Sequence, residues 1–187
     1  MTSLYVPGKN ECMPKKNILF ARVGVRYSKG VEDAELLKKA NAIFLEGIKV
    51  ITPGVCHETF DKAKLPVELM PESFSQAKKI SVFLSTLGPD IVKLVDEYTK
   101  AGKVFDAFLL DSWASESLEA LNDSFDRKLR EEFGEGTRRF SPGYGKVDVR
   151  MNRYIVEELL EVDSVKVLES GFLVPRKTTT CMIGWLS

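Results

Sequence analysis

The sequence predicts an α+β fold in which a mixed, mainly antiparallel sheet is flanked by helices. Helical and extended patterns are mixed along the chain without strict strand–helix–strand alternation, and the chain closes on extended segments. No linker rich in Pro, Gly or Ser divides the 187 residues, so we expect one domain over residues 1–187. Residues 1–14 are interpreted as a loose lead-in, because Pro7, Gly8 and Pro14 interrupt regular structure.

The next part of the chain contains one clear helical pattern. Residues 15–27 fit either a strand, because apolar residues alternate, or a short helix that ends near Gly24. Residues 31–47 carry apolar side chains at three- and four-residue spacing, which predicts a helix. Residues 49–60 are expected to be extended, with a bend or a sheet edge at Pro53.

The sequence pattern in the middle of the chain predicts a strand followed by two helices. Residues 78–86 are rich in β-forming side chains, and Pro89 suits the first position of a helix over 89–101. A long helix is expected over 104–133, and the glycine-rich segment 134–146 ends it. The apolar row of the long helix is Leu110, Ala114, Leu118, Leu121, Phe125 and Leu129.

The sequence pattern in the last part of the chain predicts a helix and two strands. Residues 148–161 have helical spacing. Residues 164–174 and 178–185 are expected to be strands separated by the turn Pro175–Lys177.

Charge and composition exclude several classes of protein. Lys and Arg number 27, as do Asp and Glu, and this balance argues against a nucleic-acid partner. The apolar runs are far shorter than the roughly 20 residues of a membrane span, and the first residues do not resemble a secretory signal. Cys12, Cys56 and Cys181 are far apart, which indicates reduced thiols and a cytoplasmic location.

His57 is the sole histidine of the sequence. A zinc-hydrolase helix needs two histidines, so we expect no metal site of that kind. Cys56 and His57 are neighbours whose side chains point to opposite faces if the segment is a strand, which disfavours a Cys–His dyad.

Charge is uneven along the second half of the chain. Residues 111–135 contain eight acidic and three basic side chains, whereas residues 138–153 contain five basic and one acidic. Such runs are usually solvated faces. The alternative is a site for a ligand that carries both signs of charge.

The loop 138–145 combines side chains suited to binding. Its arginines offer a planar fork for a carboxylate. Gly143 and Gly145 allow positive φ or a close approach of the backbone, and the turn that begins at Ser141 presents backbone amides. Tyr144 lies between two glycines, which makes it a poor candidate for a core aromatic.

The preceding helix carries Asp111, Ser115 and Glu119 at four-residue spacing, so they share one face. The two carboxylates lie about 12 Å apart along the axis, too far to share a proton. A paired-carboxylate hydrolase is therefore not supported, and an ordinary polar helix face remains an alternative.

Three segments resemble the activation domain of cobalamin-dependent methionine synthase, which binds S-adenosylmethionine (AdoMet). The helix segment 110–121 is the first, and Arg139–Tyr144 is similar to the Arg-x-x-Pro-Gly-Tyr loop of that family. The third comprises residues 168–170 and 175–180, similar to its Leu-Thr-Glu-Ser and Pro-x-x-Ser-Val-Ser segments. The chain looks like a free-standing version whose methionine synthase is a separate polypeptide.

The resemblance implies a function in methionine biosynthesis. In this family the domain binds AdoMet and docks on the cobalamin-binding part of the enzyme. An electron donor such as flavodoxin or ferredoxin reduces the inactive cob(II) state, and methyl transfer from AdoMet then restores methylcobalamin. The implied cofactors are AdoMet and a cobalamin carried by the partner.

The resemblance also implies roles for loop residues. Arg139 would bind the ligand carboxylate, and Ser141 and Gly143 would offer backbone contacts to the ligand. Tyr144 would lie at the reacting centre, near the upper face of the corrin.

Two helix residues complete the implied site. Glu119 would lie by the cationic end of the ligand, with Asp111 as a weaker companion on the same face.

Two other interpretations remain open. One is a non-catalytic module that docks on a corrinoid protein or senses AdoMet. The other is an activator of a different corrinoid methyltransferase. An ordinary AdoMet methyltransferase is disfavoured, because no glycine-rich loop follows an early strand with an acidic residue downstream.

Overall fold

A four-stranded antiparallel sheet forms the centre of the molecule. The computed structural model describes residues 2–24 and 34–186. The strand order is β1-β2-β3-β6, so β1 and β6 are the edge strands. The strands are β1 (Ser3–Tyr5), β2 (Gly54–Asp61), β3 (Lys79–Thr86) and β6 (Thr178–Trp185).

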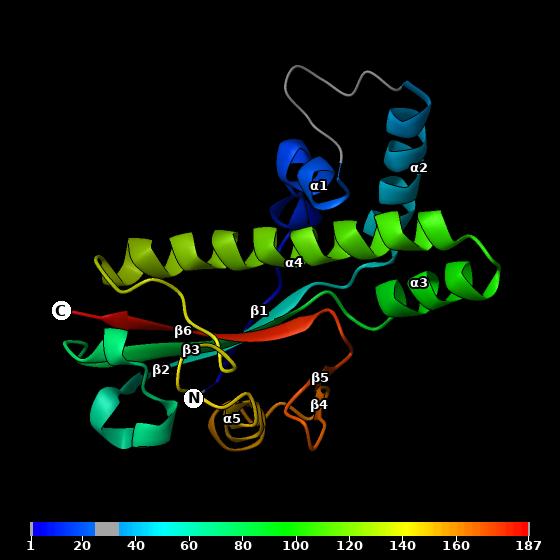
Figure 1. The fold of residues 1–187 in the computed structure, drawn as a ribbon. Helices are drawn as coiled ribbons and strands as arrows, with labels where there is room; N and C mark the ends of the chain where they lie inside the picture. Colours follow the sequence, from blue (N-terminus) through cyan, green and yellow to red (C-terminus); the bar gives the residue numbers. More distant parts are fainter. Residues whose placement is uncertain (1, 25–33, 187) are drawn as a thin grey trace.

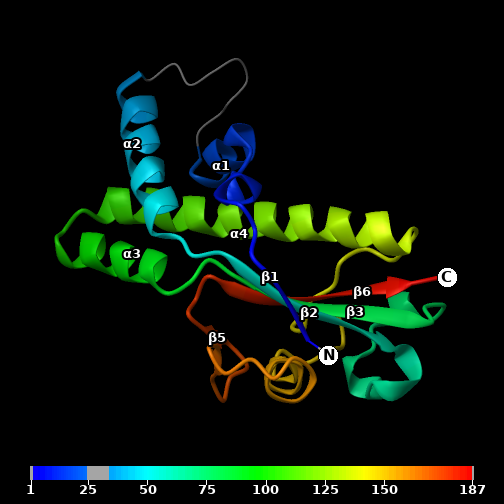
Figure 2. The same cartoon turned by 180° about the vertical axis from the view of Figure 1, so that it is seen from behind.

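Helices cover both faces of this sheet (Figures 1 and 2). The long helix α4 crosses one face, and α1 and α2 lie on its outer side. The short helix α5 and a small hairpin lie on the opposite face. The helices are α1 (Lys16–Arg22), α2 (Ala34–Val50), α3 (Asp90–Lys100), α4 (Val104–Phe133) and α5 (Met151–Arg153), which continues as the π-helix η5 (Tyr154–Leu159). The single-turn 3-10 helices are η1 (Lys9–Cys12), η2 (Lys62–Lys64), η3 (Val67–Leu69) and η4 (Glu72–Phe74).

The sheet divides the apolar side chains into two cores. Because side chains alternate along a strand, Phe83 of β3 packs toward α4 while its neighbours Val82 and Leu84 pack toward the other face. All six residues of the predicted apolar row of α4 are buried. Each large apolar side chain buried in this way contributes about 1.5–3 kcal/mol to the free energy of unfolding. The α+β prediction with a mainly antiparallel sheet is confirmed.

Most predicted elements occur close to their predicted bounds. The helix over 104–133 and the strand over 78–86 agree with α4 and β3 to within one residue. Segment 15–27 takes the helical alternative as α1, since Leu19 and Phe20 are adjacent and both buried. Residues 25–27 of that segment, and residues 31–33 of the next predicted helix, lie outside the described residues.

The prediction of one strand over 164–174 was wrong. The segment is a hairpin of β4 (Lys166–Val167) and β5 (Leu173–Val174), which pair with each other and not with the main sheet. Gly171 has φ 85°, and the resulting turn reverses the chain before a long strand can form.

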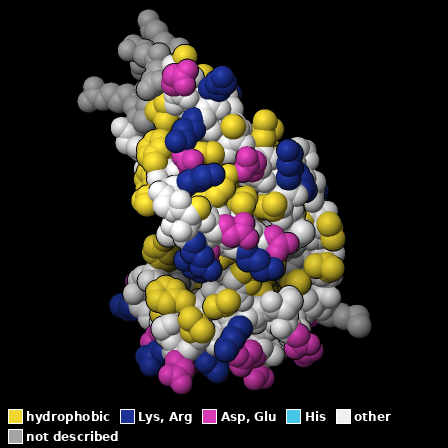
Figure 3. Space-filling view, turned by 90° about the vertical axis from the view of Figure 1, so that its right-hand side faces the viewer, with side chains coloured by type: hydrophobic (Ala, Val, Ile, Leu, Met, Phe, Trp, Pro, Cys, Tyr) yellow, Lys and Arg dark blue, Asp and Glu magenta, His cyan; other side chains and the backbone are white. Residues whose placement is uncertain are grey.

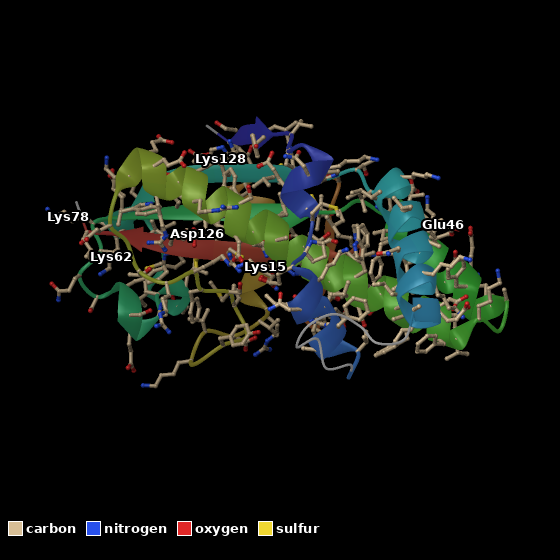
Figure 4. All side chains as sticks on the ribbon, turned by 90° about the horizontal axis from the view of Figure 1, so that it is seen from above. Lys15, Glu46, Lys62, Lys78, Asp126 and Lys128 are labelled. Atoms are coloured by element: carbon tan, nitrogen blue, oxygen red, sulfur yellow. The ribbon has the colours of Figure 1, made fainter. Side chains whose placement is uncertain are left out.

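The interpretation of residues 1–14 as a loose lead-in was also wrong. Strand β1 pairs with β2, and Cys12 is fully buried. Glu11 joins this segment to α4: its carboxylate accepts hydrogen bonds from Tyr5 Oη at 2.7 and 2.9 Å and from Ser124 Oγ at 2.9 Å. Lys128 of α4, which is labelled in Figure 4, has its Nζ 4.9 Å from the centroid of the Tyr5 ring.

We expect this attachment to weaken at acidic pH. Burial alone would raise the pKa of Glu11, but hydrogen bonds from Tyr5, Ser124 and the Gly8 amide outweigh it and lower the pKa below 4.5. A lowered pKa in the folded state gives stability that is present above pH 4.5 and is lost as the pH falls through the folded-state value. Urea unfolding from pH 7 to pH 3 should therefore show a steeper loss of stability for the wild type than for Glu11→Gln. Parallel losses would contradict this.

Candidate functional site

A cavity of about 600 Å³ lies beside the first half of edge strand β6. Its volume is within the usual range of small-molecule sites, about 300–1,000 Å³. Helix α4, the loop after it, α5 and the β4–β5 hairpin all contribute to its wall. The lining residues are Glu119, Ser141, Pro142, Tyr144, Val149, Asn152, Leu168, Phe172, Leu173, Val174, Arg176 and Thr178–Thr180.

A buried hydrogen-bond chain joins three segments of this wall. Thr180 Oγ1 of β6 donates to Asn152 Oδ1 at 2.5 Å, and Asn152 Nδ2 donates to the Gly171 carbonyl at 2.9 Å. Both side chains are more than nine-tenths buried, so losing one partner would leave an unsatisfied polar group. The chain therefore holds the hairpin against α5 and β6.

The loop after α4 reaches the cavity by pairing with the outer edge of β6. The Phe140 amide donates to the Met182 carbonyl at 2.9 Å, and the Met182 amide donates back at 2.7 Å. This pairing places the next residue, Ser141, in the cavity wall, with its Oγ 3.5 Å from Cys181 Sγ. Burial raises the pKa of Cys181 to about 11, so its thiol is protonated at neutral pH.

Arg139 does not line the cavity. Its side chain is 18% exposed, and its guanidinium donates to Glu119 Oε2 at 2.7 Å and to Asp123 Oδ1 at 2.9 Å. Glu119 both lines the cavity and holds this arginine. Of the predicted charged residues, Arg139 and Glu119 are therefore brought together.

Aromatic and aliphatic side chains surround the cavity mouth. Tyr144 is 71% exposed and Phe172 is 65% exposed, and both line the cavity. Leu168 and Val174 of the hairpin region are also exposed lining residues. Figure 3 shows that basic and acidic side chains are interspersed among hydrophobic ones on the face that carries α3 and the hairpin.

Gly143 uses its backbone amide within the loop. Its amide donates to the Val147 carbonyl at 2.9 Å, and the residue does not line the cavity. Its φ of 95° instead allows the tight turn that projects Tyr144. Gly143 therefore shapes the loop, and its amide already has the Val147 carbonyl as its hydrogen-bond partner.

Asp111 also lies outside the cavity wall. Its Oδ1 is 2.8 Å from Lys177 Nζ, so its charge is directed to a buried lysine. The helix face predicted from Asp111, Ser115 and Glu119 is thus divided: the first two contact Lys177, and Glu119 contacts Arg139.

Cavity volume alone does not distinguish this cavity from other cavities of the structure. A cavity of about 650 Å³ is lined by Cys56 and Glu58, and one of about 480 Å³ by His57 and Phe125. Cys56 and His57 therefore face opposite sides of β2, as expected. Burial lowers the pKa of His57 against the opposing effect of Glu132, and its ring packs edge-on to Phe125.

Sequence comparisons find neither a protein-family model nor a curated protein that matches this chain. A comparison of structures does find a match. The fold superposes on the crystal structure of the MetH reactivation domain bound to AdoHcy with a TM-score of 0.74 and 16% identity. The match covers 99% of this chain and 78% of that one.

The chain has the fold of the methionine synthase reactivation domain. The resemblance of three short segments is thereby confirmed at the level of the whole fold. The superposition also covers the N-terminal half of the chain, which contains none of the three segments.

Within residues 2–24 and 34–186, no group of three or more His, Cys, Asp or Glu side chains is arranged to hold a metal ion. No helix in the same ranges has the length and apolar character needed to cross a bilayer.

Sequence reasoning missed several residues of the cavity and of the contacts beside it. Asn152 and Phe172 had no assigned role, because neither belongs to a recognisable motif. Lys177 and Thr180 lie inside a segment that carried the resemblance, and their contacts with α4 and α5 required the folded chain.

Proposed function

We propose that this chain binds AdoMet in the cavity beside β6 and presents its methyl group to reduced cobalamin on a separate partner chain. The observation that carries this proposal is the meeting of all three family-like segments at one cavity. Glu119 comes from the first segment, Ser141 and Tyr144 from the second, and Thr178–Thr180 from the third. The reactivation fold, whose solved relative binds AdoHcy, adds independent support.

The chemistry needs little from this chain beyond positioning. AdoMet supplies an electrophilic methyl group on its sulfonium, and the cobalt of the reduced partner cobalamin supplies the electron pair. Methyl transfer breaks the sulfur–methyl bond, forms the cobalt–methyl bond and leaves AdoHcy. An electron donor such as flavodoxin or ferredoxin provides the electron that first reduces cob(II) to cob(I). The chain holds the two reactants in line.

Arg139 and Glu119 provide the charge pattern that an amino-acid ligand requires. Binding of the ligand carboxylate to Arg139 replaces Glu119, one of the two acidic partners of this arginine. Glu119 is then free to face the positive end of the ligand. Ser141 lines the cavity from the loop, and Tyr144 covers the cavity mouth on the side that faces the partner.

The affinity order of three ligands tests the proposal. Calorimetric titration should show saturable binding of AdoMet and AdoHcy, and adenosine should bind at least about tenfold more weakly because it lacks the groups that pair with Arg139 and Glu119. Equal affinity for adenosine would remove the proposed role of the ion pair. Methyl transfer is then followed as the absorbance change from cob(II)alamin to methylcobalamin in the partner.

One observation favours a second function, a docking or sensing module without methyl transfer. Arg139 already has two acidic partners in this structure, so the ligand must displace one of them. If AdoMet binds but no methylcobalamin forms with the reduced partner present, the sensing module is the better description. If neither AdoMet nor AdoHcy binds with the partner present, a docking module is.

A further inference from the structure

Lys177 is a buried lysine between two residues that line the cavity, Arg176 and Thr178. Its side chain is 9% exposed, and its ammonium lies 2.8 Å from Asp111 Oδ1, 3.1 Å from the Asp111 carbonyl and 2.7 Å from Ser115 Oγ. An ammonium has three donors, and all three have a partner on α4. Such pairing is what makes the burial of a charge tolerable.

The backbone around Lys177 is bound to the end of β3 and to the residue that follows it. Its carbonyl accepts the Leu87 amide at 2.9 Å, and Thr86 Oγ1 lies 2.8 Å from Thr178 Oγ1. The residue thus joins α4 to the end of β3 at the point where β6 begins. The next residues, Thr178–Thr180, form the β6 wall of the cavity.

Asp111 is well placed to hold Lys177 and poorly placed to touch a ligand. It does not line the cavity, and its Oδ1 is directed to the ammonium. It stands eight residues before Glu119, which does line the cavity, so about 12 Å of helix axis separates the two.

We propose that Lys177, Asp111 and Ser115 form a clasp that positions the β6 wall of the ligand cavity against α4. Asp111 and Lys177 are positioning residues: they act on ligand affinity through Thr178–Thr180 and not by contact with the ligand. The affinity measurements below rest on the proposed function, whereas the exchange measurement does not.

The pair Asp111→Ala and Asp111→Asn tests how Asp111 acts. Alanine removes the side-chain acceptor of Lys177, so Kd for AdoHcy should rise about five- to tenfold. Asparagine keeps an oxygen that can accept from Lys177 Nζ and removes only the charge, so its Kd should stay within about twofold of the wild type. An Asp111→Asn variant that loses as much affinity as Asp111→Ala would show that Asp111 acts through its charge and not by holding Lys177 Nζ, and that result would overturn the clasp.

A double mutant gives a second test by affinity. Lys177→Met/Asp111→Ala should bind AdoHcy no more weakly than Lys177→Met alone, because the first change already removes what Asp111 holds. Multiplied losses would show independent actions and would overturn the proposal. Asp90→Ala is the matched control, because it removes an exposed carboxylate paired with Lys93 on α3.

Amide hydrogen exchange of ligand-free protein tests the clasp without any ligand. Residues 177–180 should exchange faster in Asp111→Ala than in the wild type, Asp111→Asn or Asp90→Ala. If the wild type does not bind AdoHcy even with its partner, the proposed function fails while this measurement still decides the clasp. Unchanged exchange in Asp111→Ala would overturn the clasp.

Discussion

Replacement of Arg139 by alanine is expected to weaken the binding of AdoMet and AdoHcy by roughly ten- to a hundredfold. A hydrogen bond to a charged group contributes about 1.5–3 kcal/mol, and each 1.4 kcal/mol is a factor of ten in Kd. The guanidinium is paired with Glu119, which lines the cavity. Calorimetric titration of wild type and Arg139→Ala with AdoHcy measures the effect directly.

Arg138→Ala is the matched control for this experiment. Arg138 precedes Arg139 in the same loop, is exposed, and makes no ion pair among the described residues. Stability should change little in Arg139→Ala, because the released Glu119 and Asp123 carboxylates are 55% and 70% exposed. Equal affinities of Arg139→Ala and wild type would refute the loop assignment.

Replacement of Gly171 by alanine is expected to destabilise the protein by about 3 kcal/mol or more. Gly171 has φ 85°, a conformation that costs any residue with a side chain. A Cβ at this position would also lie 2.6 Å from the carbonyl carbon and oxygen of Val149. Because these atoms belong to the backbone, either the hairpin or the α5 segment must move.

Gly102→Ala separates the two causes. Gly102 has φ 72°, but a Cβ there meets nothing within 4 Å. It should therefore lose only the conformational cost, about 1 kcal/mol. Urea unfolding of both variants measures the difference. If the two variants lose equal unfolding free energy, the close approach of the hairpin to Val149 does not contribute to the loss at Gly171.

The sequence by itself determined the elements whose signals are local. The helix α4 could be located because a row of six apolar residues repeats at helical spacing and glycines follow its last turn. Strand β3 could be located because a β-rich run precedes a Gly-Pro pair. The loop that contains Arg139 and Tyr144 was identified from its own residue types.

Local patterns were insufficient where pairing is distant. Strand β1 has three residues, too few for a periodic signal, and is ordered by its register with β2 some fifty positions later. The segment 164–174 has strand composition, but the turn at Gly171 makes it pair with itself. In both cases the partner in space decided the structure.

The tertiary structure alone decided how the site residues are divided. Asp111 and Glu119 share a helix face in the sequence pattern, yet Asp111 pairs with Lys177 and Glu119 with Arg139. The helix repeat sets which residues share a face but does not set what lies opposite each turn. That depends on where β6 and the loop after α4 cross the helix, because a buried ammonium and a guanidinium bind the carboxylates within their reach.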